Sequence, residues 1–329
     1  MSDPVHASGG FDVCLTVEGQ EGVGWTQWRE LAAVTEECGF HGLFRSDHYL
    51  SEHEGSNRAA LEAWGTICAL AAVTTRIRLG TLVSPASFRH PSVLAKLVVT
   101  ADHVSSGRVE LGMGAGWFEA EHAAYGFPFL GVHERMEVLE EQLEIITHAW
   151  GSRRFSFTGR HYRIAELDAW PKPVQQPRVP LVVGGVGGPR SVGIAARWAD
   201  EYNTPLAAER QVRDRRAAFL QAWERAGRDP ALARFSVMAP ALVGVDRDDL
   251  ERTARRAARF QGADESDPAG YLRDNVDTCV IGTVDEVITR LRGLRAIGVN
   301  RVLLESVDHT DLNMIRLIGR EVIPVVSDL

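Results

Sequence analysis

The chain has 329 residues, of which 45% are hydrophobic and 24% charged, a balance typical of globular proteins. The formal net charge of -8 gives a nucleic-acid partner no electrostatic support. No apolar run reaches membrane-spanning length, and Met1–Gly10 lacks the charged-then-apolar layout of a signal peptide. We therefore expect a cytoplasmic protein that contacts neither nucleic acid nor membrane.

The sequence offers no sign of a metal site or a disulfide framework. The four cysteines are scattered without a C-x-x-C pair, which favours reduced, buried thiols. His48 and His53 are five residues apart, the wrong spacing for a helical metal pair, and no carboxylate completes a zinc set. We expect no bound metal. No G-x-S-x-G motif supports serine-hydrolase chemistry either.

Short apolar strands alternate with longer amphipathic segments along the chain. Strands are expected at Phe11–Val17, Gly42–Arg45, Ile77–Val83, Arg108–Met113, Leu181–Val183, Asp200–Asn203, Phe235–Val243 and Arg301–Glu305. Helices are expected at Thr26–Cys38, Leu61–Val73, Ser92–Val104, His133–Trp150, Val192–Trp198, Glu209–Ala226, Arg247–Phe260, Val284–Ile297 and Leu312–Val322. Alternation predicts a parallel sheet, and roughly eight units in this length predict a closed (β/α)₈ TIM barrel.

No change in composition marks a linker, so a single domain is expected over residues 1–329. The polar, proline-rich segment Arg153–Pro180 predicts an insertion before the fifth strand, with a small hairpin in its first half. A second insertion is expected after the seventh strand. In barrels of this kind, active sites form from the loops that follow the strands.

The loops after the second and third strands carry polar side chains. In "RSDHY", Asp47 and His48 are well placed for proton transfer or for binding a polar heterocycle, although Asp47 would equally serve as a cap. In "TLVSPASFRHP", two prolines stiffen the loop while Ser84 and Ser87 offer hydroxyls; plain turn chemistry is the alternative.

Alternating glycines mark the end of the fourth strand, in "LGMGAGWFEAEHAAYGFPF". Gly112, Gly114 and Gly116 do not form a dinucleotide fingerprint, because Trp117 stands where its last glycine would be. They leave one face bare for a flat ring or another backbone, or they form a tight strand end without a ligand. Trp117 and Phe118 are either core residues or an aromatic wall.

After the fifth strand, "VVGGVGGPRS" predicts a phosphate site. Gly184, Gly185, Gly187 and Gly188 free the backbone amides, a proline follows at the first helical position, and Arg190 adds a cation. A helix N-terminus with exposed amides binds anions, most often phosphate. A purely structural turn is the alternative.

Seven segments together resemble the luciferase-like monooxygenase superfamily, particularly its coenzyme F420-dependent branch. They are "SDHY", "LGTLVSPASFRHP", "GRVELGMGAGWFEAEHAAYGFPF", "PKPV", "VVGGVGGPRS", "ADEYN" and "IGTVDEV", in this order along nearly the whole chain. The resemblance implies a barrel, usually homodimeric, that binds a flavin or deazaflavin at its C-terminal mouth together with a small-molecule substrate.

The resemblance also assigns residues. His48 matches the catalytic histidine at the reactive face of the cofactor, and Asp47 matches a deazaflavin contact. Further cofactor contacts are matched at Thr81 and Leu82 (where a non-proline cis peptide often bulges against the ring), Ser84, Ala115, Gly116, Gly187, Gly188, Arg190 and Ser191.

One position departs from the pattern. Trp117 stands where the similar F420-dependent glucose-6-phosphate dehydrogenases carry a catalytic glutamate, which argues against sugar-phosphate oxidation. The resemblance thus implies an F420-dependent oxidoreductase that transfers hydride between the deazaflavin and a small organic substrate. The alternatives are an FMN-dependent luciferase-like monooxygenase and a non-catalytic flavin-binding barrel.

Overall fold

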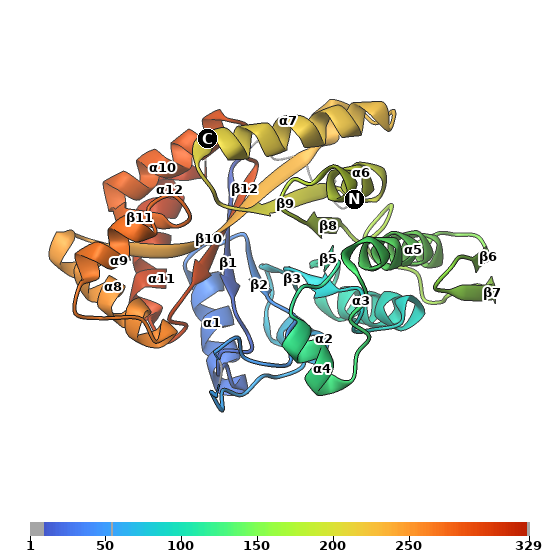
Figure 1. The fold of residues 1–329 in the computed structure, drawn as a ribbon, viewed down its shortest axis with the longest axis horizontal. Coiled ribbons are helices and arrows are strands. Elements are labelled where there is room, and N and C mark those ends of the chain that lie inside the picture. The colour runs from blue at the N-terminus through green and yellow to red at the C-terminus, as the bar shows by residue number, and fades with distance from the viewer. Residues whose placement is uncertain (1–9, 54, 328–329) are drawn as a thin grey trace.

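Eight parallel strands form a closed barrel in the computed structural model, which describes residues 10–53 and 55–327 (Figure 1). In barrel order they are β1 (Asp12–Val17), β2 (Gly42–Arg45), β3 (Arg78–Thr81), β5 (Val109–Gly114), β8 (Leu181–Gly184), β9 (Glu201–Pro205), β10 (Arg234–Gly244) and β12 (Arg301–Ser306). Pairing of β10 with β9 and of β12 with β1 closes the barrel. The expected (β/α)₈ barrel is confirmed, whereas the expectation for Met1–Gly10 falls almost wholly outside the described residues.

Helices surround the barrel. They are α1 (Trp25–Glu37), α2 (Ala63–Val73), α3 (Pro91–Ser105), α4 (Glu119–Tyr125), α5 (Val132–Trp150), α6 (Pro189–Trp198), α7 (Glu209–Arg225), α8 (Arg247–Gln261), α9 (Pro268–Asp274), α10 (Val284–Ala296), α11 (Leu312–Leu317) and α12 (Ile323–Val326). Pro91 and Pro189 occupy first-turn positions, where their missing N–H groups leave no hydrogen bond unmade. Thr283 and Glu286 form the expected capping box of α10. In the described part of the chain, no helix combines the length and apolarity needed to cross a membrane.

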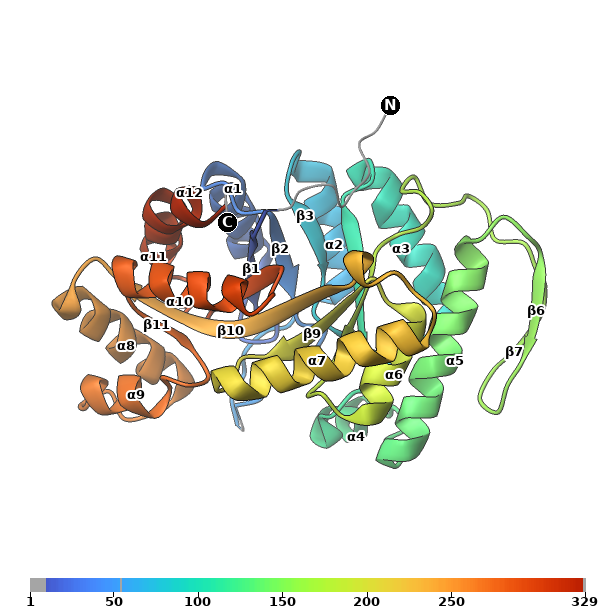
Figure 2. The same ribbon diagram turned by 90° about the horizontal axis from the view of Figure 1, so that it is seen from above.

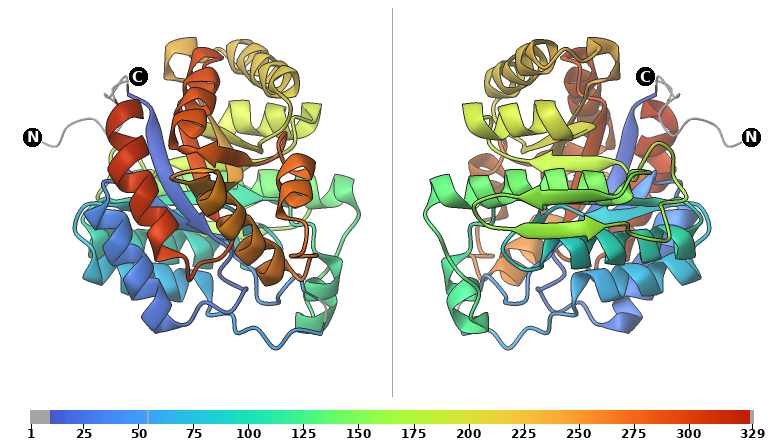
Figure 3. Two further views of the ribbon diagram at one scale, coloured as in Figure 1. Left: turned by 90° about the vertical axis from the view of Figure 1, so that its left-hand side faces the viewer. Right: turned by 90° about the vertical axis from the view of Figure 1, so that its right-hand side faces the viewer.

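The segments in which insertions were expected hold extra elements at opposite edges of the molecule (Figures 1 and 2). An antiparallel hairpin of β6 (Phe155–Thr158) and β7 (Arg163–Leu167) precedes β8. It lies outside the helices, facing the viewer in the right-hand view of Figure 3. After β10 come α8, α9 and the short strand β11 (Val280–Thr283), which extends the sheet along the end of β10. The two-residue strand β4 (Ser84–Pro85) pairs with β5.

Buried charges close the N-terminal end of the barrel. Arg301 begins β12 and is 3% exposed; its guanidinium donates to Glu110 of β5 at 2.8 Å and to Glu201 of β9. Above this layer, Cys14, Phe44 and Leu303 pack inside the barrel. In the described part of the chain, side chains therefore fill the N-terminal half of the barrel interior.

Candidate active site

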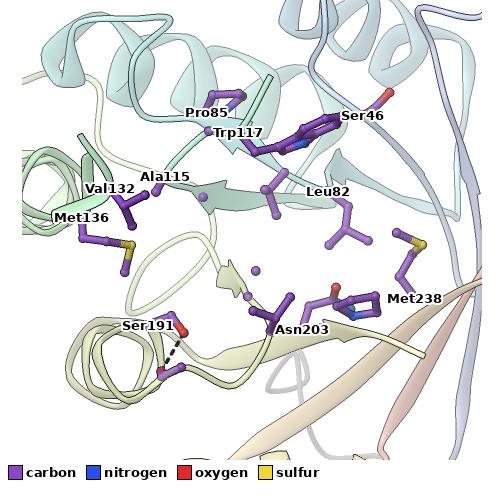
Figure 4. Close-up of a pocket in the computed structure, with 18 of the residues that line it drawn as sticks. Ser46, Leu82, Pro85, Ala115, Trp117, Val132, Met136, Ser191, Asn203 and Met238 are labelled. Atoms are coloured by element: carbon purple, nitrogen blue, oxygen red, sulfur yellow. Dashed lines mark hydrogen bonds between the residues drawn. The ribbon is translucent and has the colours of Figure 1, made fainter. Parts of the chain in front are cut away.

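A cavity of about 820 Å³ opens at the C-terminal ends of the strands (Figure 4). This volume lies within the range of small-molecule and cofactor sites, roughly 300–1,000 Å³. Every strand of the barrel, or the loop that follows it, contributes to the wall: Glu18, Ser46, His48, Leu82, Val83, Ala115, Gly185, Asn203, Pro205, Met238 and Glu305. The strand ends thus converge on one site, as the barrel architecture requires.

Thr81 and Val83 together explain the alternating glycines of β5. A Cβ at Gly112 would lie 2.1 Å from the carbonyl oxygen of Thr81, and one at Gly114 would lie 2.7 Å from Cγ2 of Val83. A Cβ at Gly184 would lie 3.0 Å from Cγ1 of Val83. Because this face of β5 carries no side chains at Gly112 and Gly114, the segment that follows β3 can pack directly against it. The peptide bond between Leu82 and Val83 is cis, one bond beyond the Thr81–Leu82 pair expected to bear it.

His48 is held by a buried carboxylate. Its Nδ1 lies 2.9 Å from Oε2 of Glu121, whose residue is fully buried on α4. The other oxygen of Glu121 accepts the backbone N–H groups of Tyr49 and Leu50, the latter at 3.1 Å. Burial alone would lower the pKa of His48, but the hydrogen bond and charge of Glu121 outweigh it, so the pKa is raised. The ring is fixed, and Nε2 has no hydrogen-bond partner among the described residues.

Aromatic rings stand over His48. Trp117 lines the cavity and remains 59% exposed, and its ring centroid lies 5.8 Å from that of His48. Phe118 stacks on Trp117 at 5.2 Å. Of the two expectations for these side chains, the structure supports an aromatic wall.

Three expected cofactor contacts lie behind the cavity wall instead of on it. Asp47 is 1% exposed and accepts hydrogen bonds from Arg89 at 2.5 and 3.0 Å and from Ser84 at 2.6 Å. Ser84 lies 3.1 Å from the hydroxyl of Thr81 and accepts the indole N–H of Trp64. These groups satisfy one another and brace the ends of β2 and β3.

The N-terminus of α6 faces the cavity, as the glycine-rich loop predicts. Gly184, Gly185, Gly188, Arg190 and Ser191 all line the cavity. Two of the expected amides are used internally: Gly185 donates to the carbonyl of Asn203 at 2.9 Å, and Gly187 donates to the hydroxyl of Tyr202 at 2.8 Å. Gly187 adopts a φ of +86° and shapes the turn. The amides left for an anion belong to the first turn of α6.

Sequence reasoning missed an acidic wall. Glu18 follows β1, Glu52 lies beyond the loop of His48, and Glu305 is in β12; all three line the cavity. Burial raises the pKa of Glu305 to about 8, and the charges of Glu18 and Glu52 contribute to this shift. These three glutamates could have been found from the sequence by their positions at or after the ends of strands. Among the described residues, no group of histidine, cysteine, aspartate and glutamate side chains is arranged to hold a metal ion.

Proteins of known activity resemble the chain. An F420-dependent hydroxymycolic acid dehydrogenase of Mycobacterium tuberculosis is 32% identical over 219 residues, which cover 66% of this chain and 59% of that protein. An FMNH(2)-dependent dimethylsulfone monooxygenase of Pseudomonas putida is 25% identical over 329 residues, covering 92% of this chain and 88% of that protein. In other curated relatives, including the hydroxymycolic acid dehydrogenase, the matched part covers less than two thirds of the relative's own length.

The fold has close counterparts among solved structures. An F420-dependent secondary alcohol dehydrogenase, in complex with an F420-acetone adduct, superimposes with a TM-score of 0.81 at 21% identity, covering 96% of this chain and 99% of that one. The sequence model for the family described as luciferase-like monooxygenase matches residues 11–301, nearly the whole barrel. With its closed barrel and its cavity at the strand ends, this chain belongs to the luciferase-like monooxygenase family.

Proposed function

We propose that this protein is an F420-dependent oxidoreductase that transfers hydride between the deazaflavin and a small organic substrate. The observation that carries the proposal is the pairing of His48 with Glu121 at the cavity wall. With Nδ1 engaged, Nε2 is the atom that can give a proton to a reacting group or take one from it.

The cavity suits a planar cofactor with a phosphate. When bound, coenzyme F420 supplies a hydride donor or acceptor at one carbon of its ring. Gly188, Arg190 and Ser191, at the start of α6, would hold the phosphate. Val83 and Ala115 would face the ring from the glycine-lined wall.

The remaining residues position and shield the reactants. Trp117 and Phe118 cover His48 and limit the access of water, which strengthens electrostatic interactions inside the site. Trp117 replaces the catalytic glutamate expected of the glucose-6-phosphate dehydrogenases, so this proposal does not include sugar-phosphate oxidation.

Parallel titration with F420 and FMN tests the proposal, followed by turnover under argon. We expect the protein to bind F420 tightly and to show no binding of FMN. Reduced F420 and a panel of enones, imines and quinones should then return the absorbance of the oxidised deazaflavin without oxygen. A requirement for reduced FMN and oxygen would refute this assignment.

The second candidate is an FMN-dependent monooxygenase, because the dimethylsulfone monooxygenase of Pseudomonas putida matches 92% of the chain. Both cofactors carry a phosphate for α6 and a flat ring for the glycine-lined wall, so the oxygen requirement distinguishes them. If the barrel is non-catalytic, substitution of His48 should change no enzymatic activity. We also propose a homodimer, which sedimentation equilibrium tests directly.

A further inference from the structure

The acidic wall has no role in the hydride transfer proposed above. Glu18 and Glu52 come close together because one buried amide donates to both: Nε2 of Gln20 lies 2.8 Å from Glu18 and 3.5 Å from Glu52. The oxygen of the same amide accepts the hydroxyl of Ser46 at 2.6 Å, which fixes its orientation. Glu305 faces the same space from β12.

None of these three carboxylates has an ion-pair partner in residues 10–53 and 55–327. Arg58, a nearby cation, is engaged by Glu21 at 2.6 Å. Arg190, the arginine of the cavity wall, follows β8, which lies across the barrel from β1 and β12. Burial and repulsion among the carboxyl groups raise the pKa of Glu52 and Glu305, although the charge of a protonated His48 acts on Glu52 in the opposite direction.

Two further features point to an organic ligand at this wall. His48 lines the same cavity and is only 8% exposed, yet its Nε2 has no hydrogen-bond partner in the described part of the chain. A side chamber of about 420 Å³ adjoins the wall and shares Pro205, Met238 and Glu305 with the main cavity. Its other lining is largely apolar and includes Leu206, Pro240, Leu242 and Val307. A bare metal ion would leave that apolar chamber unused, and the described carboxylates are not arranged to hold one.

We propose that the organic substrate carries a protonated nitrogen, which Glu18, Glu52 and Glu305 bind, and an apolar body, which occupies the side chamber. The proposal rests on the proposed function only in calling this ligand the substrate. An ammonium group offers donors to the three carboxyl groups, offsets the repulsion among them and lowers the raised pKa of Glu305, so that Glu305 ionises when the ligand binds. A neutral alcohol of the same shape satisfies fewer acceptors and leaves the repulsion in place.

Isothermal titration calorimetry with matched probes tests the proposal. Benzylamine, phenethylamine and 3-phenylpropylamine are titrated into the protein with and without F420, alongside the alcohols and carboxylates of the same skeletons. We expect each amine to bind at least about tenfold more tightly than its alcohol, and the carboxylates to bind more weakly still. Affinity should rise with the length of the apolar part.

Glu18→Gln and Glu305→Gln should each weaken amine binding by about tenfold or more, with circular dichroism and F420 affinity unchanged. Glu30→Gln, at an exposed position of α1, is the matched control and should change nothing. Equal affinity for amines and alcohols, or amine binding that survives both substitutions, would overturn the proposal. The parallel F420 titration judges the oxidoreductase assignment separately, because amine binding is measured without turnover.

Discussion

At the scale of single residues, Glu121 sets both the orientation and the basicity of His48. Glu121→Gln keeps the volume and one acceptor but removes the charge that raises the pKa of His48. We expect kcat to fall by about tenfold to a hundredfold, since small misplacement of a reacting group slows the chemical step strongly. F420 affinity should remain within about twofold.

The pH profile separates this role from a general structural one. Because Glu121 raises the pKa of His48, its replacement should move the limb of the profile that reports on His48 to lower pH. Glu119→Gln, on the same helix but exposed, is the control. An unshifted limb would mean that Glu121 holds the loop without tuning the imidazole.

We expect Glu305 to make the stability of the protein depend on pH. Its pKa is about 8 in the folded protein, above the ordinary value of 4.5, so the folded state retains a proton that the unfolded state has lost. Stability should therefore fall as pH rises through the window between 4.5 and 8. Glu305→Gln should raise the melting temperature by about 2 °C or more at pH 9 and leave it unchanged at pH 4. A gain of equal size at both values would rule out titration as the cause.

At the scale of elements, the start of α6 gives a test of anion binding. Gly188 has a φ of -63°, and a Cβ there would come no closer than 3.9 Å to its neighbours, so Gly188→Val should fold normally. The branched side chain would stand where phosphate approaches the first turn, and F420 affinity should drop by about tenfold or more. Unchanged affinity would place the phosphate elsewhere.

Gly193 supplies the matched control for that substitution. It lies on the exposed side of α6, and a methyl group added there would have no heavy atom within 4 Å other than those of its chain neighbours and the helix's own backbone. Gly193→Ala should stabilise the helix by up to about 1 kcal/mol and leave cofactor affinity as it was. Binding and helix stability can thus be varied independently on one element.

Elements with strong local signals were predicted from the sequence. Thr283 and Glu286 indicated the start of α10, and Pro91 indicated that of α3, because caps and first turns depend on residues a few positions apart. The short strand β11 was missed, since Val280–Thr283 is defined by pairing with β10 and not by its own pattern.

At the scale of the whole molecule, the buried charges at the base tie distant strands together. Arg301 joins β12 to β5 and β9, and its removal leaves Glu110 and Glu201 buried without their main cation. Arg301→Met should lower the free energy of unfolding by about 3–5 kcal/mol, measured by urea denaturation. The control Arg320→Met, at an exposed ion pair, should change it by less than about 0.5 kcal/mol. A small loss for Arg301→Met would show that the base relaxes around the gap.

Residues that meet in the site lie far apart in the sequence, and this explains which parts of the site could not be predicted. His48 was identified from its place after a strand, but its partner Glu121 is 73 residues away. Glu18 and Glu305 stand at opposite ends of the chain, and only closure of the barrel brings them to one wall. The network that buries Asp47 is likewise set by packing: Arg89 reaches it from the next loop.

The separation of charge across the cavity has a consequence for which atom of a substrate reacts. Arg190 stands on one side of the barrel, while Glu18 and Glu305 stand on the other. An anionic cofactor group and a cationic substrate would each be accepted at one side and repelled at the other, so neither can turn end over end. Under the proposed function, the reacting carbon would then lie at a set distance from the charged nitrogen, and hydride should reach the same position of the carbon skeleton in every substrate that the acidic wall binds.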